Sequence, residues 1–250
     1  TSLVSSGPCF DGPPSSAKLT LSPGKFAAVS SAADLPALGG IAALHFGDRT
    51  TGAPSTPAQT ILPRSANAQA FPSVAFDPTS STYLAVWIDD SEASTQIVPG
   101  SVDGGVTLGA SGGLRVVGAK IHSKDGGLQI DPPMGISAAG ASDVAQPKAI
   151  WDGKQFVVAW REARTVDGAL SYRVMASNVP ASGTSMPDPL LVNASRSAPP
   201  FAVAVVADTT GRIIAWTGYN ESGDARVYMK RWAFSNAAPD SNDPLPISSN

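Results

Sequence analysis

The strongest constraint on the fold is a pattern that recurs along the chain. An apolar segment ends at Asp, a short turn follows, and a second apolar segment ends at Trp. The Asp–Trp pairs are Asp77–Trp87, Asp152–Trp160 and Asp208–Trp216, with spacings of 10, 8 and 8 residues. A fourth copy at 18–30 has the same layout but lacks the Asp and ends at Ser30. A repeat of this length restricts the chain to propellers, solenoids and related arrays.

Two further apolar segments follow each anchor position. The expected third strands are 41–46, 96–98, 171–176 and 226–232, and the expected fourth strands are 59–62, 128–130, 190–192 and 245–247. The four anchors lie 57, 73 and 56 residues apart, and an insertion at roughly 101–127 accounts for the long middle interval. Four short strands recurring about every 50 to 60 residues are typical of β-propeller blades.

The pattern therefore predicts an all-β protein. We expect a β-propeller of four, or five, four-stranded blades, or part of a larger propeller. The approximate blades of this single domain, 1–250, are 1–66, 67–135, 144–195 and 199–250. Strands such as 83–87 show no polar alternation, which is expected where neighbouring blades cover both faces. One or two β-sandwiches are the alternative, but they explain the strands without explaining the recurrence.

Composition excludes some functional classes and indicates a location. The net charge of −3 argues against a nucleic-acid binder, which normally carries a basic surplus. No apolar stretch approaches the length of about 18 residues that a membrane span needs. Charged residues make up only 15% of the chain, against about 25% in an average soluble domain. With the richness in Ala, Ser, Gly, Pro and Thr, this predicts a secreted bacterial protein, extracellular or periplasmic, whose signal peptide is absent or already removed.

Cys9 is the single cysteine of the chain. An internal disulfide is thereby excluded, and a free thiol or a bridge to another chain remains open.

The blade pattern resembles the repeats of secreted bacterial β-propellers, in which a Tyr-Leu-Val-Val-Trp-like strand precedes an acidic loop. This resemblance covers roughly residues 18–248 and implies a fold rather than an activity, because propellers serve as binders, enzymes and scaffolds alike.

A second resemblance lies within the expected insertion. The segment Ser101-Val-Asp103-Gly-Gly105-Val-Thr107-Leu108 is similar to the Asp-box of sialidases, Ser-x-Asp-x-Gly-x-Thr-Trp, with Leu108 in place of Trp. A poorer copy occupies 123–130. In that family the box is a structural hairpin turn away from the active site, so it identifies no catalytic residue. Ordinary Asp-Gly-Gly hairpins are the alternative interpretation.

The polar segments that follow the Trp residues are the candidate functional surface. They come after the same strand of successive blades, so they should share one face, with the three repeated Asp turns on the opposite side. We expect a polar, partly acidic rim that contacts a glycan, a protein or a cation, with simple solvation of exposed loops as the alternative. The candidate ligand-binding residues are Asp89, Asp90, Glu92, Arg161, Glu162, Arg164, Asp167, Tyr219, Asn220, Glu221 and Asp224.

No catalytic or metal-binding motif is recognisable, so the first functional hypothesis is non-enzymatic. We expect an extracytoplasmic protein- or carbohydrate-binding module, or an assembly subunit whose propeller another chain completes. The alternative is a sialidase-like glycoside hydrolase. We predict no cofactor, although calcium would suit oxygen-rich loops despite the lack of an EF-hand spacing. We predict no nucleic-acid partner.

Overall fold

The computed structural model describes residues 17–22, 25–32, 41–48, 59–60, 69–89, 114–124, 127–138, 141, 143–183, 186–195, 200, 202–220, 222–240 and 244–247. Cys9 and the first Asp-box-like segment lie outside these residues. Within them there is no helix, and hence no helix that could span a membrane.

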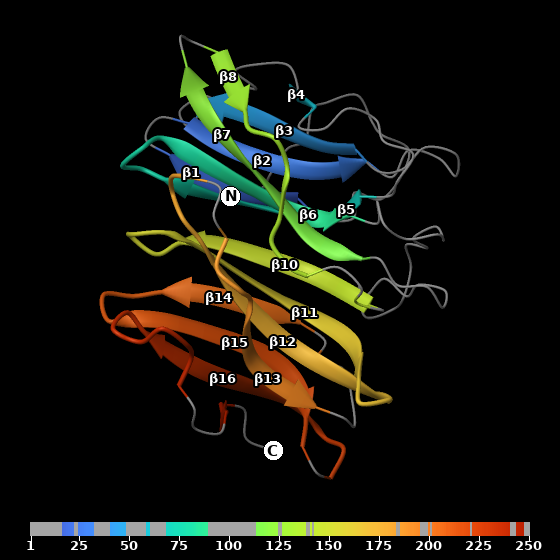
Figure 1. The fold of residues 1–250 in the computed structure, drawn as a ribbon. Coiled ribbons are helices and arrows are strands. Elements are labelled where there is room, and N and C mark those ends of the chain that lie inside the picture. Colours follow the sequence, from blue (N-terminus) through green and yellow to red (C-terminus); the bar gives the residue numbers. More distant parts are fainter. Residues whose placement is uncertain are drawn as a thin grey trace.

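Strands arranged in four antiparallel sheets make up the fold, and each sheet follows the order of the sequence (Figure 1). The first sheet contains β1 (Ala17–Ser22), β2 (Lys25–Ala32), β3 (Ile41–Asp48) and β4 (Gln59–Thr60). The second contains β5 (Gln69–Asp77), β6 (Thr82–Asp89), β7 (Arg115–Lys124) and β8 (Gly127–Ile130), with β9 (Met134–Gly135) also paired to β7. The third contains β10 (Asp143–Trp151), β11 (Phe156–Val166), β12 (Ala169–Val179) and β13 (Leu190–Ser195). The fourth contains β14 (Val203–Ala207), β15 (Gly211–Tyr219), β16 (Ala225–Ala233) and β17 (Leu245–Pro246).

The sheets stack in series, mainly through their first strands. Strand β5 contacts β1 and β2, β10 contacts β5 and β6, and β14 contacts β10 and β11. The first and last sheets lie toward opposite ends of the stack (Figure 1). Four-stranded meanders packed in this way are the blades of a propeller, which confirms the predicted fold class.

The repeated Trp residues occupy equivalent positions in the second strand of three successive sheets. Trp87, Trp160 and Trp216 are 1%, 0% and 3% exposed. Trp160 shares a hydrophobic cluster with Val86 of the second sheet, and Trp216 shares one with Ala159 of the third. Each of these two side chains therefore packs against the preceding sheet, as expected for strands that neighbouring blades cover on both faces.

The repeated Asp residues close the turns between the first and second strands. Oδ1 of Asp77 accepts a hydrogen bond from the backbone N–H of Thr79 at 2.8 Å. Oδ1 of Asp152 accepts two, from residues 154 and 155, at 2.8 and 2.9 Å. Asp208 does the same with residues 210 and 211, at 2.7 and 2.9 Å. A carboxylate that binds the backbone two residues onward mimics a turn, so the recurrent Asp has a local structural role.

The turn also lowers one pKa. Hydrogen bonds from Thr210, first from its hydroxyl and then from its backbone N–H, hold the pKa of Asp208 below its ordinary value of 3.8. Hydrogen bonds to the charged form favour that form.

The segment expected to be an insertion, 101–127, contains the third strand of the second sheet, and this part of the prediction is wrong. Strand β7 pairs with β6 from Thr82↔His122 to Asp89↔Arg115. The expected third strand, 96–98, lies outside the described residues. The segment 96–98 is nearer to Trp87 in sequence, but nearness in sequence does not determine which strand pairs with β6. Strand β7 pairs with β6 along the whole length of β6, which a segment of three residues could not do.

The second Asp-box-like segment begins at the end of this third strand. Residues Ser123 and Lys124 end β7 and pair with Leu128 and Gly127 of β8. The segment therefore spans the junction between the third and fourth strands. Its assignment as an Asp-box remains a prediction.

Candidate functional site

The second strands run from the Asp turns to the opposite end of each sheet. Strand β11, for example, begins after the turn at Asp152 and ends at Val166, where β12 begins the return. We call this opposite end of the second, third and fourth sheets the post-Trp end; among the described residues it contains 89, 115, 161–173, 217–220 and 222–228. The predicted separation of the Asp turns from the post-Trp residues is present in each of these sheets.

The structure places most of the predicted site residues at this end, and several of them lie on strands rather than in loops. Strand β6 includes Asp89, β11 includes Arg161, Glu162 and Arg164, and β15 includes Tyr219. Asp167 lies in the turn after β11, and Asn220 and Asp224 lie in the turn after β15. Asp90, Glu92 and Glu221 lie outside the described residues. The expectation that Trp marks the end of the strand is wrong, because the hairpins continue to pair beyond it.

Glu162 is the centre of a buried charged cluster. Its side chain is 3% exposed. Trp160 Nε1 donates to Oε2 at 3.1 Å, and Arg164 Nε donates to Oε1 at 3.3 Å. Arg173 Nη1 lies 4.0 Å from Oε1. Both carboxylate oxygens are thus engaged, as a buried charge requires.

The cluster leaves its two arginines partly accessible. The side chains of Arg164 and Arg173 are 24% and 22% exposed. Arg164 Nη2 also donates to the carbonyl oxygen of Ala138, 3.1 Å away, in the segment that joins the second and third sheets. Glu162 therefore positions two cations at the post-Trp end near this junction.

Arg161 faces the other side of the third sheet, because successive strand residues point to opposite faces. It is 2% exposed, and its Nη1 donates to the carbonyl oxygen of Pro200 at 2.7 Å. This contact ties β11 to the segment that precedes β14. Asp89 is 8% exposed and pairs in register with Arg115. Neither residue is part of the exposed rim that the sequence predicted.

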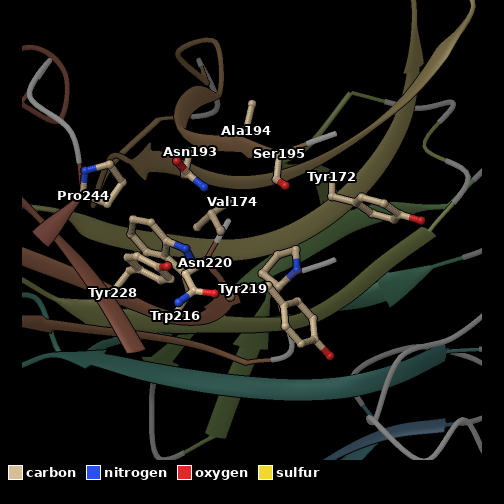
Figure 2. A pocket seen from close by; sticks show the side chains of 12 residues that line it. Tyr172, Val174, Asn193, Ala194, Ser195, Trp216, Tyr219, Asn220, Tyr228 and Pro244 are labelled. Carbon is tan, nitrogen blue, oxygen red and sulfur yellow. The ribbon is translucent and has the colours of Figure 1, made fainter. Parts of the chain in front are cut away.

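A pocket of about 310 Å³ lies between the third and fourth sheets. In Figure 2, Trp216 and Tyr228 lie toward one side of it, Tyr219 and Tyr172 toward the other, and Asn193 and Ser195 above. The lining residues come from β12, β13, β15, β16 and nearby turns, and they are Tyr172, Val174, Asn193, Ala194, Ser195, Pro200, Trp216, Gly218, Tyr219, Asn220, Tyr228 and Pro244.

The pocket is rich in aromatic and uncharged polar groups. The rings of Trp216 and Tyr228 are stacked, with centroids 6.2 Å apart and an interplanar angle of 22°. Asn220 is fixed by Asp224, whose backbone N–H donates to Asn220 Oδ1 at 2.8 Å. Asn220 Nδ2 in turn donates to Asp224 Oδ2 at 3.1 Å. No charged residue is among the described residues that line this pocket.

Sequence reasoning found two members of this pocket, Tyr219 and Asn220, and missed the rest. Tyr172 and Tyr228 stand on third strands, which the sequence analysis treated only as blade elements. Asn193 and Ser195 lie on a fourth strand, and no local signal places that strand at the same pocket as residues of β15. Among the described residues, no group of His, Cys, Asp and Glu could hold a metal ion.

Comparisons with known proteins relate the chain to carbohydrate-active propellers by structure. No family model and no curated protein matches the sequence. A Trypanosoma rangeli sialidase in complex with the inhibitor DANA is similar with a TM-score of 0.59 and 10% identity, over 92% of this chain and 37% of the sialidase. An α-L-arabinofuranosidase from Lactobacillus brevis is similar with a TM-score of 0.55 and 8% sequence identity, over 91% of this chain and 72% of the enzyme. A GH43 endo-arabinanase from Bacillus licheniformis is similar with a TM-score of 0.50 and 11% sequence identity, over 89% of this chain and 75% of the arabinanase.

At such low identity these matches establish the fold alone. The chain is an all-β protein with the architecture of β-propeller sialidases and GH43 enzymes. It spans less than two fifths of the length of that sialidase.

Proposed function

We propose that the protein acts on glycans as a propeller of the glycoside hydrolase type, with its substrate held at the post-Trp end. The observation that carries this proposal is that about nine tenths of the chain matches sialidase, arabinanase and arabinofuranosidase structures. This favours the hydrolase that the sequence analysis kept as its alternative. Fold likeness alone does not determine function, so the chemistry of the described residues must supply the rest.

Three kinds of side chain at the post-Trp end could serve such a reaction: arginines, exposed aspartates and the buried Glu162. The partly exposed guanidinium groups of Arg164 and Arg173 could bind an anionic sugar substituent, since arginine matches a carboxylate with paired donors. The exposed carboxyl groups of Asp167 and Asp224 are available as acid or base. Glu162 is already bound on both oxygens, which gives it a positioning role.

The test is hydrolysis of fluorogenic glycosides, with a sialoside, α-L-arabinofuranoside and neutral hexosides in one panel. We expect turnover of at least one substrate, reduced by Asp167→Asn or Asp224→Asn, or by Arg173→Gln when the substrate is anionic. Asp208→Asn is the matched control, because Asp208 is an exposed carboxylate at the opposite end of its sheet. Absence of turnover across the panel by correctly folded protein would overturn the hydrolase proposal.

The engagement of Glu162 favours a second candidate, the non-enzymatic binding module. A site whose buried carboxylate is saturated by Trp160 and Arg164 can hold a ligand without performing acid–base chemistry. In that case immobilised glycans or proteins should retain the folded protein and release no cleavage product. Both candidates suit the extracytoplasmic location that the composition indicates.

A further inference from the structure

We propose that the pocket between the third and fourth sheets is a binding subsite for one unit of a neutral saccharide, and that it binds this unit without cleaving it. This inference rests on the proposed action on glycans, and it adds a ligand class and a place. The pocket lies on the side of the third sheet away from the Glu162 cluster.

The two faces of β12 separate the sites. Tyr172 and Val174 line the pocket, whereas Arg173, between them in sequence, approaches Glu162 on the other face. Alternation along a strand produces this separation. The charged cluster and the pocket are therefore distinct sites at one end of the same sheet.

The size and the walls suit a single sugar ring. A volume of about 310 Å³ lies at the lower limit of small-molecule pockets, roughly 300–1,000 Å³. Four aromatic side chains contribute to the lining: Tyr172, Trp216, Tyr219 and Tyr228. A pyranose or furanose ring has faces of C–H bonds that pack on an aromatic ring, and burying those faces is favourable.

The polar groups match hydroxyl groups rather than a charge. Asn193 and Asn220 carry amides, and Ser195 carries a hydroxyl. Amides and hydroxyls both donate and accept hydrogen bonds, as sugar hydroxyl groups do. An anionic sugar would need a cation, and the described lining contains none. The described lining likewise holds no carboxylate that could act as acid or nucleophile, so its chemistry supports binding alone.

Gly218 keeps the pocket open. A Cβ placed at Gly218 would lie 3.4 Å from Cε2 of Tyr228, within ordinary contact distance. That Cβ would also lie 3.6 Å from Cδ1 of Trp216, so a larger side chain would fill space beside both rings without removing a polar group. Gly218→Val is therefore a variant that blocks the pocket by volume.

The experiment measures binding of neutral arabino-, xylo- and cello-oligosaccharides, and of sialyllactose, by isothermal titration calorimetry. We expect a neutral oligosaccharide to bind and sialyllactose not to bind at this pocket. Gly218→Val and Tyr219→Ala should each lower the affinity for the neutral ligand by roughly tenfold or more, which corresponds to about 1.4 kcal/mol of binding free energy. Asp208→Asn, at the opposite end of the fourth sheet, should leave its affinity unchanged, and Arg173→Gln is measured alongside to detect binding at the charged cluster. Circular dichroism melts verify that every variant is folded.

The outcomes separate this inference from the proposed hydrolysis. Loss of neutral-sugar binding in Gly218→Val, in a protein that hydrolyses no glycoside, would uphold the subsite and reject the hydrolase. Hydrolysis of a glycoside by wild type, with unchanged neutral-sugar binding in both pocket variants, would reject the subsite and uphold the hydrolase. No binding of any neutral oligosaccharide by wild type, or binding that only Arg173→Gln abolishes, would also overturn the inference.

Discussion

Arg212 joins the third and fourth sheets at the end opposite the pocket. Its Nε lies 2.6 Å and its Nη2 2.5 Å from Oδ2 of Asp152, and the two residues are 4% and 8% exposed. The guanidinium also lies over the ring of Trp232, 4.4 Å from its centroid. We predict that Arg212→Met lowers the free energy of unfolding by about 3–5 kcal/mol, because it leaves a buried carboxylate unpaired. Urea denaturation measures this loss.

The exposed Arg231 is the control for this prediction. It donates to the hydroxyl of Thr210 at the surface, so Arg231→Met should change stability by no more than about 0.5 kcal/mol. Equal losses in the two variants would show that Arg212 and Asp152 do not form a buried pair. The double variant with Asp152→Asn should recover part of the loss, because no carboxylate charge then remains buried.

Lys120 gives the stability a pH dependence. It is 2% exposed, and its Nζ donates to the carbonyl oxygen of Gly183 in the next sheet at 2.6 Å. Burial lowers the pKa of Lys120 from its ordinary value of 10.5, and the charge of Asp131 partly opposes this. Between the lowered pKa and 10.5 the unfolded chain binds more protons than the folded one, so this residue makes stability rise with pH. Lys120→Met should remove that rise. Denaturation at a series of alkaline pH values measures the free energy of unfolding of both proteins. Identical pH profiles of wild type and variant would contradict the prediction.

At the scale of elements, the second strand of the third sheet, β11, combines a structural and a positioning role. Trp160 is fully buried, and its indole N–H holds Glu162. We predict that Trp160→Ala costs about 3–5 kcal/mol, and that Trp160→Phe costs less because it keeps most of the packing. Both variants remove the hydrogen bond to Glu162. If ligand binding at the post-Trp end requires the Glu162 cluster, the affinity should fall in both variants. Thermal melts measure their stabilities, and Trp160→Ala should melt at a lower temperature than Trp160→Phe. Equal melting temperatures would show that the packing of Trp160 does not stabilise the protein.

At the scale of the whole molecule, the last sheet differs from the second and third sheets in having an uncovered face. All of β6 is buried, whereas in β15 the residues Ile213 and Ala215 are only partly buried. The register places Val206 beside Ile213 and Leu245 beside Met229 on this face, and Val206 and Leu245 are 56% and 60% exposed. A contiguous apolar sheet face of this kind is typical of an interaction surface. It is consistent with the hypothesis that a further blade or chain completes the propeller.

The opposite face of β14 provides the comparison that tests this. Val203 is 3% exposed and packs against the third sheet. For an isolated chain we predict that Val206→Lys changes stability by at most about 0.5 kcal/mol, whereas Val203→Lys costs several kcal/mol through an unpaired buried charge. Guanidinium denaturation with sedimentation analysis measures both. Comparable losses from the two, with dissociation of an oligomer in Val206→Lys, would show that another copy covers the face in solution.

Most of the strands, the Asp turns and the buried Trp positions of this protein could be predicted from the sequence, because each depends on a few adjacent residues. The Asp turns need only a carboxylate and the amides two or three residues onward, and apolar runs that end at Trp pair locally with their neighbours. Which strand pairs third with β6 depends on tertiary contacts, because Arg115–Lys124 and 96–98 are both apolar segments that follow β6 in sequence. The tertiary structure also decided that Arg161 and Glu162 face different sheets. The pocket depends entirely on the tertiary structure, because Tyr172, Asn193 and Tyr219 come together only when two successive blades pack against each other.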